Sequence, residues 1–196
     1  MKKYILLSVV SVVLFYSCGQ KQDEKKVETP IPSNCKFSQN GKDSLGKKLR
    51  VVEAEKFMAL QFPDSATQAL YKGEDFVKGY LSCVTEDTVL AINVDVTIHT
   101  EDAYQYYGTI KKGNNITFIL KSGKTVEVPF GSTFSGNTNI SKESTEYSSF
   151  AHLSRDAAKQ LKSEDLQRVI ISWSKKDEEY PAVNPKIFIN QLPCVE

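Results

Sequence analysis

Histidine and carboxylate side chains are the groups best suited to metal or acid–base chemistry, and in this sequence they are sparse and scattered. The chain has only two histidines, His99 and His152. A zinc site needs several ligands that converge, and closely spaced His or Cys pairs are its usual sequence sign. No H-x-x-H, H-E-x-x-H or C-x-x-C spacing is present. We therefore expect no metal site and no cofactor.

Nucleophile motifs are equally weak. Ser44 and Lys47 match the S-x-x-K pattern of penicillin-recognising enzymes, but Gly46 and its polar surroundings disfavour the helix that this motif must open. No serine stands in a G-x-S-x-G elbow, and the acidic pairs Glu101-Asp102 and Glu178-Glu179 lie in expected turns. The sequence thus assigns no catalytic residue. A hydrolase stays open as an alternative, because pairs of catalytic carboxylates leave little trace in a sequence.

A run of tyrosines is the best candidate for ligand recognition. Tyr104, Tyr106 and Tyr107 follow two carboxylates. If this run is a strand, alternate tyrosines are exposed and could stack on sugar rings, since tyrosine combines apolar area with a polar tip. The alternative is that one tyrosine face packs in the core while the other covers the edge of a sheet.

The N-terminus has the form of an export signal. Lys2 and Lys3 precede an apolar run of about 13 residues, Tyr4 to Tyr16. A bilayer-spanning helix needs roughly 20 apolar residues, so residues 1–17 are predicted to be a signal peptide and not a membrane anchor.

The end of this run, Leu14-Phe15-Tyr16-Ser17-Cys18-Gly19, resembles a bacterial lipoprotein signal, and its Ser-Cys-Gly ending is similar to lipoproteins of the Bacteroidota. The resemblance implies cleavage before Cys18, with acyl chains on that residue, such as palmitate, as the anchor. Two or three chains give stable attachment without a spanning helix. The expected location is the outer membrane, on its periplasmic or cell-surface face. The alternative is a signal cleaved elsewhere, which releases a soluble protein.

Residues 18–44 are predicted to be a flexible tether, because they contain few apolar residues and a mixed charge run. Removing the signal takes away two of 25 basic residues and none of 24 acidic ones, which leaves a net charge of −1. A nearly neutral chain lacks the basic surface of a nucleic-acid binder, so nucleic acid is not an expected partner.

Three cysteines, Cys35, Cys83 and Cys194, follow the expected lipidation site. Disulfides persist in an oxidising envelope, and an odd number leaves one thiol free. Cys83 shares a predicted strand face with Val77 and Leu81, where a buried thiol acts as a small hydrophobe. We therefore predict a disulfide between Cys35 and Cys194.

Residues 45–196 are long enough for one domain with one core. Alternating apolar residues predict strands near 49–62, 75–84, 88–99, 146–152, 166–173 and 186–192, together with a hairpin over Ile116–Phe130. One helix is predicted over 155–161, with Ser154 as its N-cap. The fold class is mainly β, an antiparallel sandwich or open barrel with one short helix. This order of elements looks like that of small Bacteroidota lipoproteins, a resemblance that implies a fold and a location but no catalytic residue.

Three tripeptides, Asp43-Ser44-Leu45, Asp64-Ser65-Ala66 and Asp87-Thr88-Val89, resemble the acceptor sites for O-linked glycans on exported Bacteroidota proteins. The resemblance implies glycosylation at Ser44, Ser65 and Thr88. Asp-Ser and Asp-Thr are also common turn and cap pairs, so the two interpretations stay open.

Three functions follow as hypotheses. The first is a non-enzymatic, lipid-anchored binding or accessory module for a glycan or an envelope protein. The others are a small envelope hydrolase and a structural envelope protein.

Overall fold

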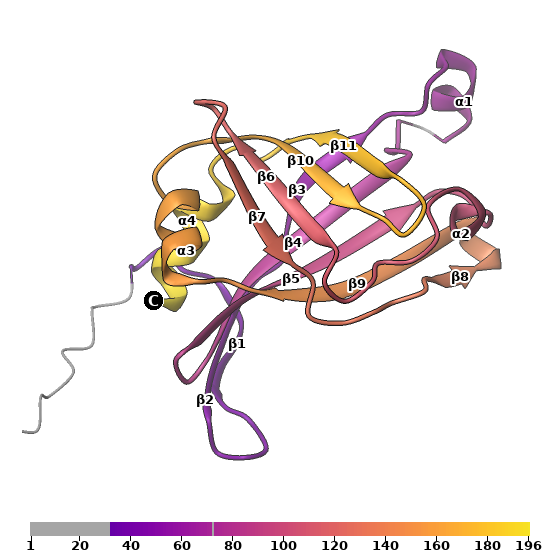
Figure 1. Cartoon of the computed structure of the whole chain (residues 1–196). Coiled ribbons are helices and arrows are strands. Elements are labelled where there is room, and N and C mark those ends of the chain that lie inside the picture. Colours follow the sequence, from indigo (N-terminus) through magenta and orange to yellow (C-terminus); the bar gives the residue numbers. More distant parts are fainter. Residues whose placement is uncertain (1–31, 72) are drawn as a thin grey trace, which may run out of the picture.

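The computed structural model describes residues 32–71 and 73–196. Its strands form two antiparallel sheets that pack face to face and do not close into a barrel (Figure 1). The predicted β class is confirmed, and the architecture is that of a sandwich.

The larger sheet has seven strands in the order β1-β2-β4-β5-β9-β8, with β3 also paired to β4. They are β1 (Phe37–Lys42), β2 (Lys48–Val52), β3 (Glu55–Leu60), β4 (Val77–Glu86), β5 (Val89–Ile98), β8 (Asn137–Asn139) and β9 (Ser144–His152). In β5 the alternate residues Ile92, Val94, Val96 and Ile98 are buried, as its pattern predicts.

The smaller sheet has the order β11-β10-β6-β7. Its strands are β6 (Asn115–Leu120), β7 (Thr125–Pro129), β10 (Leu166–Ser172) and β11 (Asp177–Pro181). The predicted hairpin is β6 and β7, and Gly123 takes a left-handed conformation in its turn (φ 85°).

The core lies between the two sheets and is rich in aromatic rings. Phe118 of β6 meets Phe188 edge to face, with ring centroids 4.8 Å apart. Beside them, the Trp173 indole N–H donates to the hydroxyl oxygen of Tyr180 at 3.1 Å. Both polar atoms are thereby satisfied within the core.

Four α-helices and one short 3₁₀ helix accompany the described strands: α1 (Ser65–Leu70), α2 (Ala103–Tyr106), η1 (Ile140–Lys142), α3 (Arg155–Leu161) and α4 (Ile187–Val195). Helix α3 is the predicted one, and Ser154 Oγ accepts from the Ala157 N–H at 3.1 Å, as an N-cap does. Figure 1 shows α3 and α4 together at one end of the sandwich and α1 away from them. The prediction of a single helix is therefore incomplete.

The strand predicted over 186–192 is wrong, because this segment begins helix α4. Its buried residues fall at helical spacing: Ile187, Phe188, Gln191, Leu192 and Val195. Isoleucine and phenylalanine favour strands only weakly, and packing against β2 and β4 overrides that preference.

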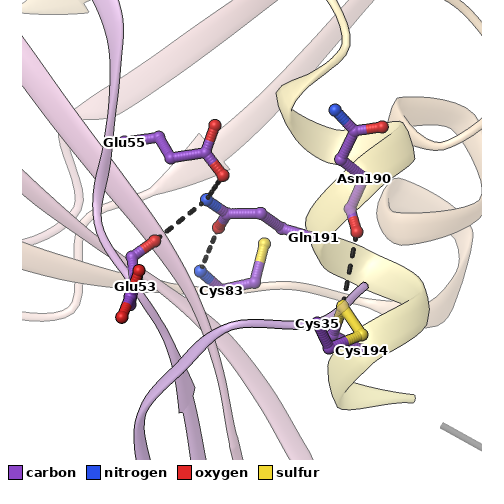
Figure 2. The surroundings of a disulfide bond; sticks show 7 residues. All are labelled: Cys35, Glu53, Glu55, Cys83, Asn190, Gln191 and Cys194. Atoms are coloured by element: carbon purple, nitrogen blue, oxygen red, sulfur yellow. Dashed lines mark hydrogen bonds between the residues drawn. A yellow bond between two sulfur atoms is a disulfide. The ribbon is translucent and has the colours of Figure 1, made fainter. Parts of the chain in front are cut away.

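The segment predicted as one strand near 49–62 is two strands, β2 and β3, which pair in succession with the same partner, β4. Gln191 of α4 lies at the break between them (Figure 2). Its side-chain oxygen accepts from the Cys83 N–H at 2.9 Å, and its amide nitrogen donates to the Glu53 carbonyl at 3.2 Å. A helix side chain thus replaces hydrogen bonds that a continuous ladder would make.

A disulfide joins Cys35 to Cys194, the pair predicted from sequence, with Cα atoms 5.7 Å apart (Figure 2). Cys83 is a free, buried thiol, and burial raises its pKa. The folded part begins earlier than residue 45, because β1 and Cys35 lie within the predicted tether of 18–44. Strand β1 forms because it pairs with β2, although its own sequence is too polar to predict a strand. Residues 18–31 and the predicted signal, residues 1–17, lie outside the described residues.

Candidate functional site

A pocket of about 520 Å³ opens on the outer face of the large sheet, the face turned away from the core. Lys78 of β4, Thr97 of β5 and Glu146 of β9 form its floor. They are cross-strand neighbours in one row, since Lys78 pairs with Thr97 and Thr97 pairs with Glu146. Their chain neighbours Val77 and Ile98 point into the core, so the row points outward. We call this cavity the sheet-face pocket.

One wall of the sheet-face pocket is the connection between α1 and β4, which contributes Tyr71 and Glu74. The Tyr71 ring stacks on Phe62 with centroids 4.4 Å apart and an interplanar angle of 15°. The buried carboxylate of Asp75 accepts from Lys56 Nζ at 2.7 Å and also from the Gln61 side-chain amide. These contacts hold the wall against the sheet.

The opposite wall lies where η1 meets β9, with Lys142 at the end of η1 and Ser144 at the start of β9. Asn139 Oδ1 accepts from the Lys142 N–H, and Glu143 takes a left-handed conformation (φ 47°) that is uncommon for a residue other than glycine. The Tyr71 hydroxyl donates to Glu143 Oε2 at 3.2 Å, which links this wall to the first one.

His99, just after β5, completes the pocket beside Glu74. Glu74 Oε2 lies 3.3 Å from Lys78 Nζ and 3.2 Å from His99 Nε2. The Nε2 atom is buried, and no described residue forms a well-aligned hydrogen bond with it. Burial lowers the pKa of His99, and the Lys78 charge lowers it further. The imidazole is therefore held in its neutral form at pH 7.

This arrangement suits the binding of a polar ligand. It offers charged groups of both signs, the Thr97 hydroxyl and one aromatic edge. Ser144 also borders the cavity but is only 1% exposed. No group of three or more metal-ligating side chains occurs among residues 32–71 and 73–196. Glu74 and Glu146 are a pair of carboxylates within one cavity, but Glu74 is already engaged in an ion pair with Lys78.

Tyr104 and Tyr106 lie on helix α2 and Tyr107 caps its C-terminus, so the tyrosine run is not a strand. None of the three lines the sheet-face pocket. Tyr104 and Tyr106 are exposed (53% and 64%), as a recognition surface requires. Tyr107 is buried at 4% exposure and meets Trp173 edge to face, so it is no longer a candidate contact. The helical turn places Tyr107 toward the core because helical residues change direction by about 100° per residue.

The three expected glycosylation positions are exposed. Ser44 lies in the β1–β2 turn and Thr88 in the β4–β5 turn, whereas Ser65 begins α1. The preceding aspartates act as turn and cap acceptors: Asp43 binds the Leu45 and Lys47 N–H groups, and Asp64 caps α1 through the Thr67 N–H. Glycosylation stays a prediction, which the intact mass of the natural protein tests. Cys18 lies outside the described residues.

Sequence reasoning considered His99 and missed the other pocket residues. The signal available was the polar face of β5, where Thr97 and His99 alternate with buried residues. Their partners on β4 and β9 depend on strand register, while Tyr71 and Lys142 reach the site from the ends of α1 and η1.

Comparison with protein-family models, with curated proteins and with solved structures found no match. In the part of the chain that the structure describes, no helix has the length and apolar character needed to cross a membrane.

Proposed function

We propose that this protein is a lipid-anchored envelope module that binds a saccharide in the sheet-face pocket without altering it chemically. The observation that carries the proposal is the pocket itself, a walled cavity that combines charges of both signs, the Thr97 hydroxyl and the Tyr71 ring. Saccharide sites commonly use such groups, because sugar hydroxyls need donors and acceptors while the apolar C–H groups of a sugar contact aromatic side chains. A protein ligand is the other partner of a binding module, and an exposed surface such as α2 would suit it.

An array of envelope, host and plant polysaccharides tests this proposal with the mature chain solubilised from membranes. We expect binding to one class of saccharide, weakened at least about fivefold by Tyr71→Ala, since an aromatic contact contributes roughly 1 kcal/mol. Glu146→Ala leaves both walls of the pocket intact. If this variant also loses saccharide binding, the loss is not caused by a disrupted wall. The Tyr104→Ala, Tyr106→Ala double variant is the matched control. If the double variant lost saccharide binding while Tyr71→Ala retained it, the binding site would lie on α2 and the assignment to the pocket would be overturned.

The anchor is a separate part of the proposal and has its own test. Cys18→Ala removes the acceptor of the acyl chains, so the variant should leave the membrane fraction for the soluble fraction. The parent protein, expressed alongside and detected in the same fractions, is the reference. Equal membrane association of variant and parent would contradict lipid anchoring.

A hydrolase is the second candidate, favoured only by the presence of Glu74 and Glu146 in one pocket. Prolonged incubation with whichever saccharide the array identifies should release no new reducing ends. If reducing ends appear and Glu146→Gln abolishes them, the protein is an enzyme and the non-enzymatic proposal falls.

A further inference from the structure

The charges of the sheet-face pocket are only partly neutralised within the protein. Glu74 pairs with Lys78, and Glu143 accepts from the Tyr71 hydroxyl. Lys142 Nζ and the Glu146 carboxylate, in contrast, form no ion pair or side-chain hydrogen bond with any residue in 32–71 or 73–196. One cation and one anion in the same cavity therefore remain available to a ligand.

These two groups are held at different places in the cavity. Glu146 stands on the floor, in the row with Thr97, because β9 is locked to β5 by its register. Lys142 stands in the wall, where Asn139 fixes its backbone and the left-handed Glu143 turns the chain toward β9. The two side chains are only four residues apart, yet they do not pair with each other.

We infer that the ligand is a zwitterionic saccharide, one that carries an anionic group for Lys142 and an amino group for Glu146. This inference rests on the proposed function. A purely acidic saccharide would face repulsion from Glu146, and a purely basic one from Lys142. A neutral saccharide would displace water from both charged groups without offering an opposite charge that compensates for the lost hydration.

The lining of the pocket favours a saccharide over a peptide. Peptides commonly dock on free strand edges or in apolar grooves that receive their hydrophobic side chains. The sheet-face pocket lies on the face of a sheet, and its lining contains no aliphatic side chain. The Thr97 hydroxyl and the charged side chains of the lining can instead form hydrogen bonds with the hydroxyls of a sugar.

Four oligosaccharides of matched length isolate the contribution of each charge. Chitin is neutral, chitosan carries amines, hyaluronan carries carboxylates, and de-N-acetylated hyaluronan carries both. Affinity for each is measured by calorimetry with the mature chain. We expect de-N-acetylated hyaluronan to bind at least about fivefold more tightly than hyaluronan or chitosan, since a charge-assisted contact contributes roughly 1 kcal/mol or more.

Variants assign each preference to its side chain. Lys142→Met should remove the preference for carboxylates, and Glu146→Gln the preference for amines. Exchanging the two charges, with Lys142→Glu and Glu146→Lys together, should restore a preference for the zwitterion that each reversal alone abolishes. Lys121→Met and Glu127→Gln are matched controls on the β6–β7 hairpin and should bind as the parent does.

The outcomes separate this inference from the proposed function. Chitin bound as tightly as de-N-acetylated hyaluronan would overturn the zwitterion while leaving saccharide binding in place. Binding of none of the four, and of nothing on the wider array, would overturn both.

Discussion

His99 is a histidine whose surroundings favour the neutral imidazole. Its side chain is 11% exposed, and its Nε2 atom lies near one carboxylate, Glu74, while the Lys78 ammonium approaches from β4. Glu74 and Asp75 raise the pKa of His99, but burial and Lys78 outweigh them and lower it. The polar face of β5 therefore contributes a titratable side chain to the sheet-face pocket.

This shift predicts a pH-dependent stability. The unfolded chain takes up the His99 proton near the ordinary pKa of 6.5, whereas the folded protein takes it up only at lower pH. The stabilisation from neutral His99 is thus complete above about pH 6.5 and is lost as the pH falls below it. Urea unfolding at pH 7.5 and pH 5.5 should show a larger loss of stability for the parent than for His99→Gln.

The exposed His152 provides the control for this experiment. His152→Gln also removes one histidine, from the end of β9, and should follow the parent. If the parent and His99→Gln lost equal stability between the two pH values, the folded protein would not favour neutral over protonated His99, and the prediction would be wrong.

Helix α4 supplies hydrogen-bond partners that the large sheet lacks at the break between β2 and β3. The break between β2 and β3 leaves the Cys83 N–H and the Glu53 carbonyl without strand partners, and the buried amide of Gln191 serves both. An amide suits this position because it carries a donor and an acceptor on one rigid group.

Replacing this amide should be costly. Gln191→Leu replaces the amide by an apolar group of similar size and leaves a buried N–H and a buried C=O unsatisfied, so we expect a loss of about 1–3 kcal/mol in the free energy of unfolding. Asn190→Leu, at the exposed neighbouring position of the same helix, should change stability by less than about 0.5 kcal/mol. Urea unfolding followed by circular dichroism measures both. Equal stability of the two variants would show that the strand break needs no partner from α4.

A disulfide bond links the two ends of the folded chain. The disulfide joins Cys35, before β1, to Cys194, in the last helix, across 159 residues. Helix α4 packs on β2 and β4, so the link also ties the start of the folded chain to the large sheet. A cross-link over so long a segment restricts the unfolded chain strongly.

Reduction should therefore destabilise the protein. Unfolding in urea with and without dithiothreitol should show a loss of about 2–5 kcal/mol on reduction. The Cys35→Ser, Cys194→Ser variant should match the reduced parent and be insensitive to the reductant, which separates the disulfide from the free thiol of Cys83. An unchanged parent midpoint would contradict a stabilising role.

Strands β4, β5, β9 and β10, the β6–β7 hairpin and helix α3 could be predicted from sequence because their signals are local. Alternation in β5 reflects one buried face, and Ser154 caps α3 through a residue only three positions away. The buried face of Cys83 was also predictable, and with it the disulfide partners.

Contacts between distant segments decided the rest. Helix α4 exists because β2 and β4 offer it a surface, which no local propensity records. The sheet-face pocket depends on register: Lys78, Thr97 and Glu146 become neighbours only when β4, β5 and β9 align. A shift of one residue would turn these side chains into the core, so burial of the opposite face is what places the site.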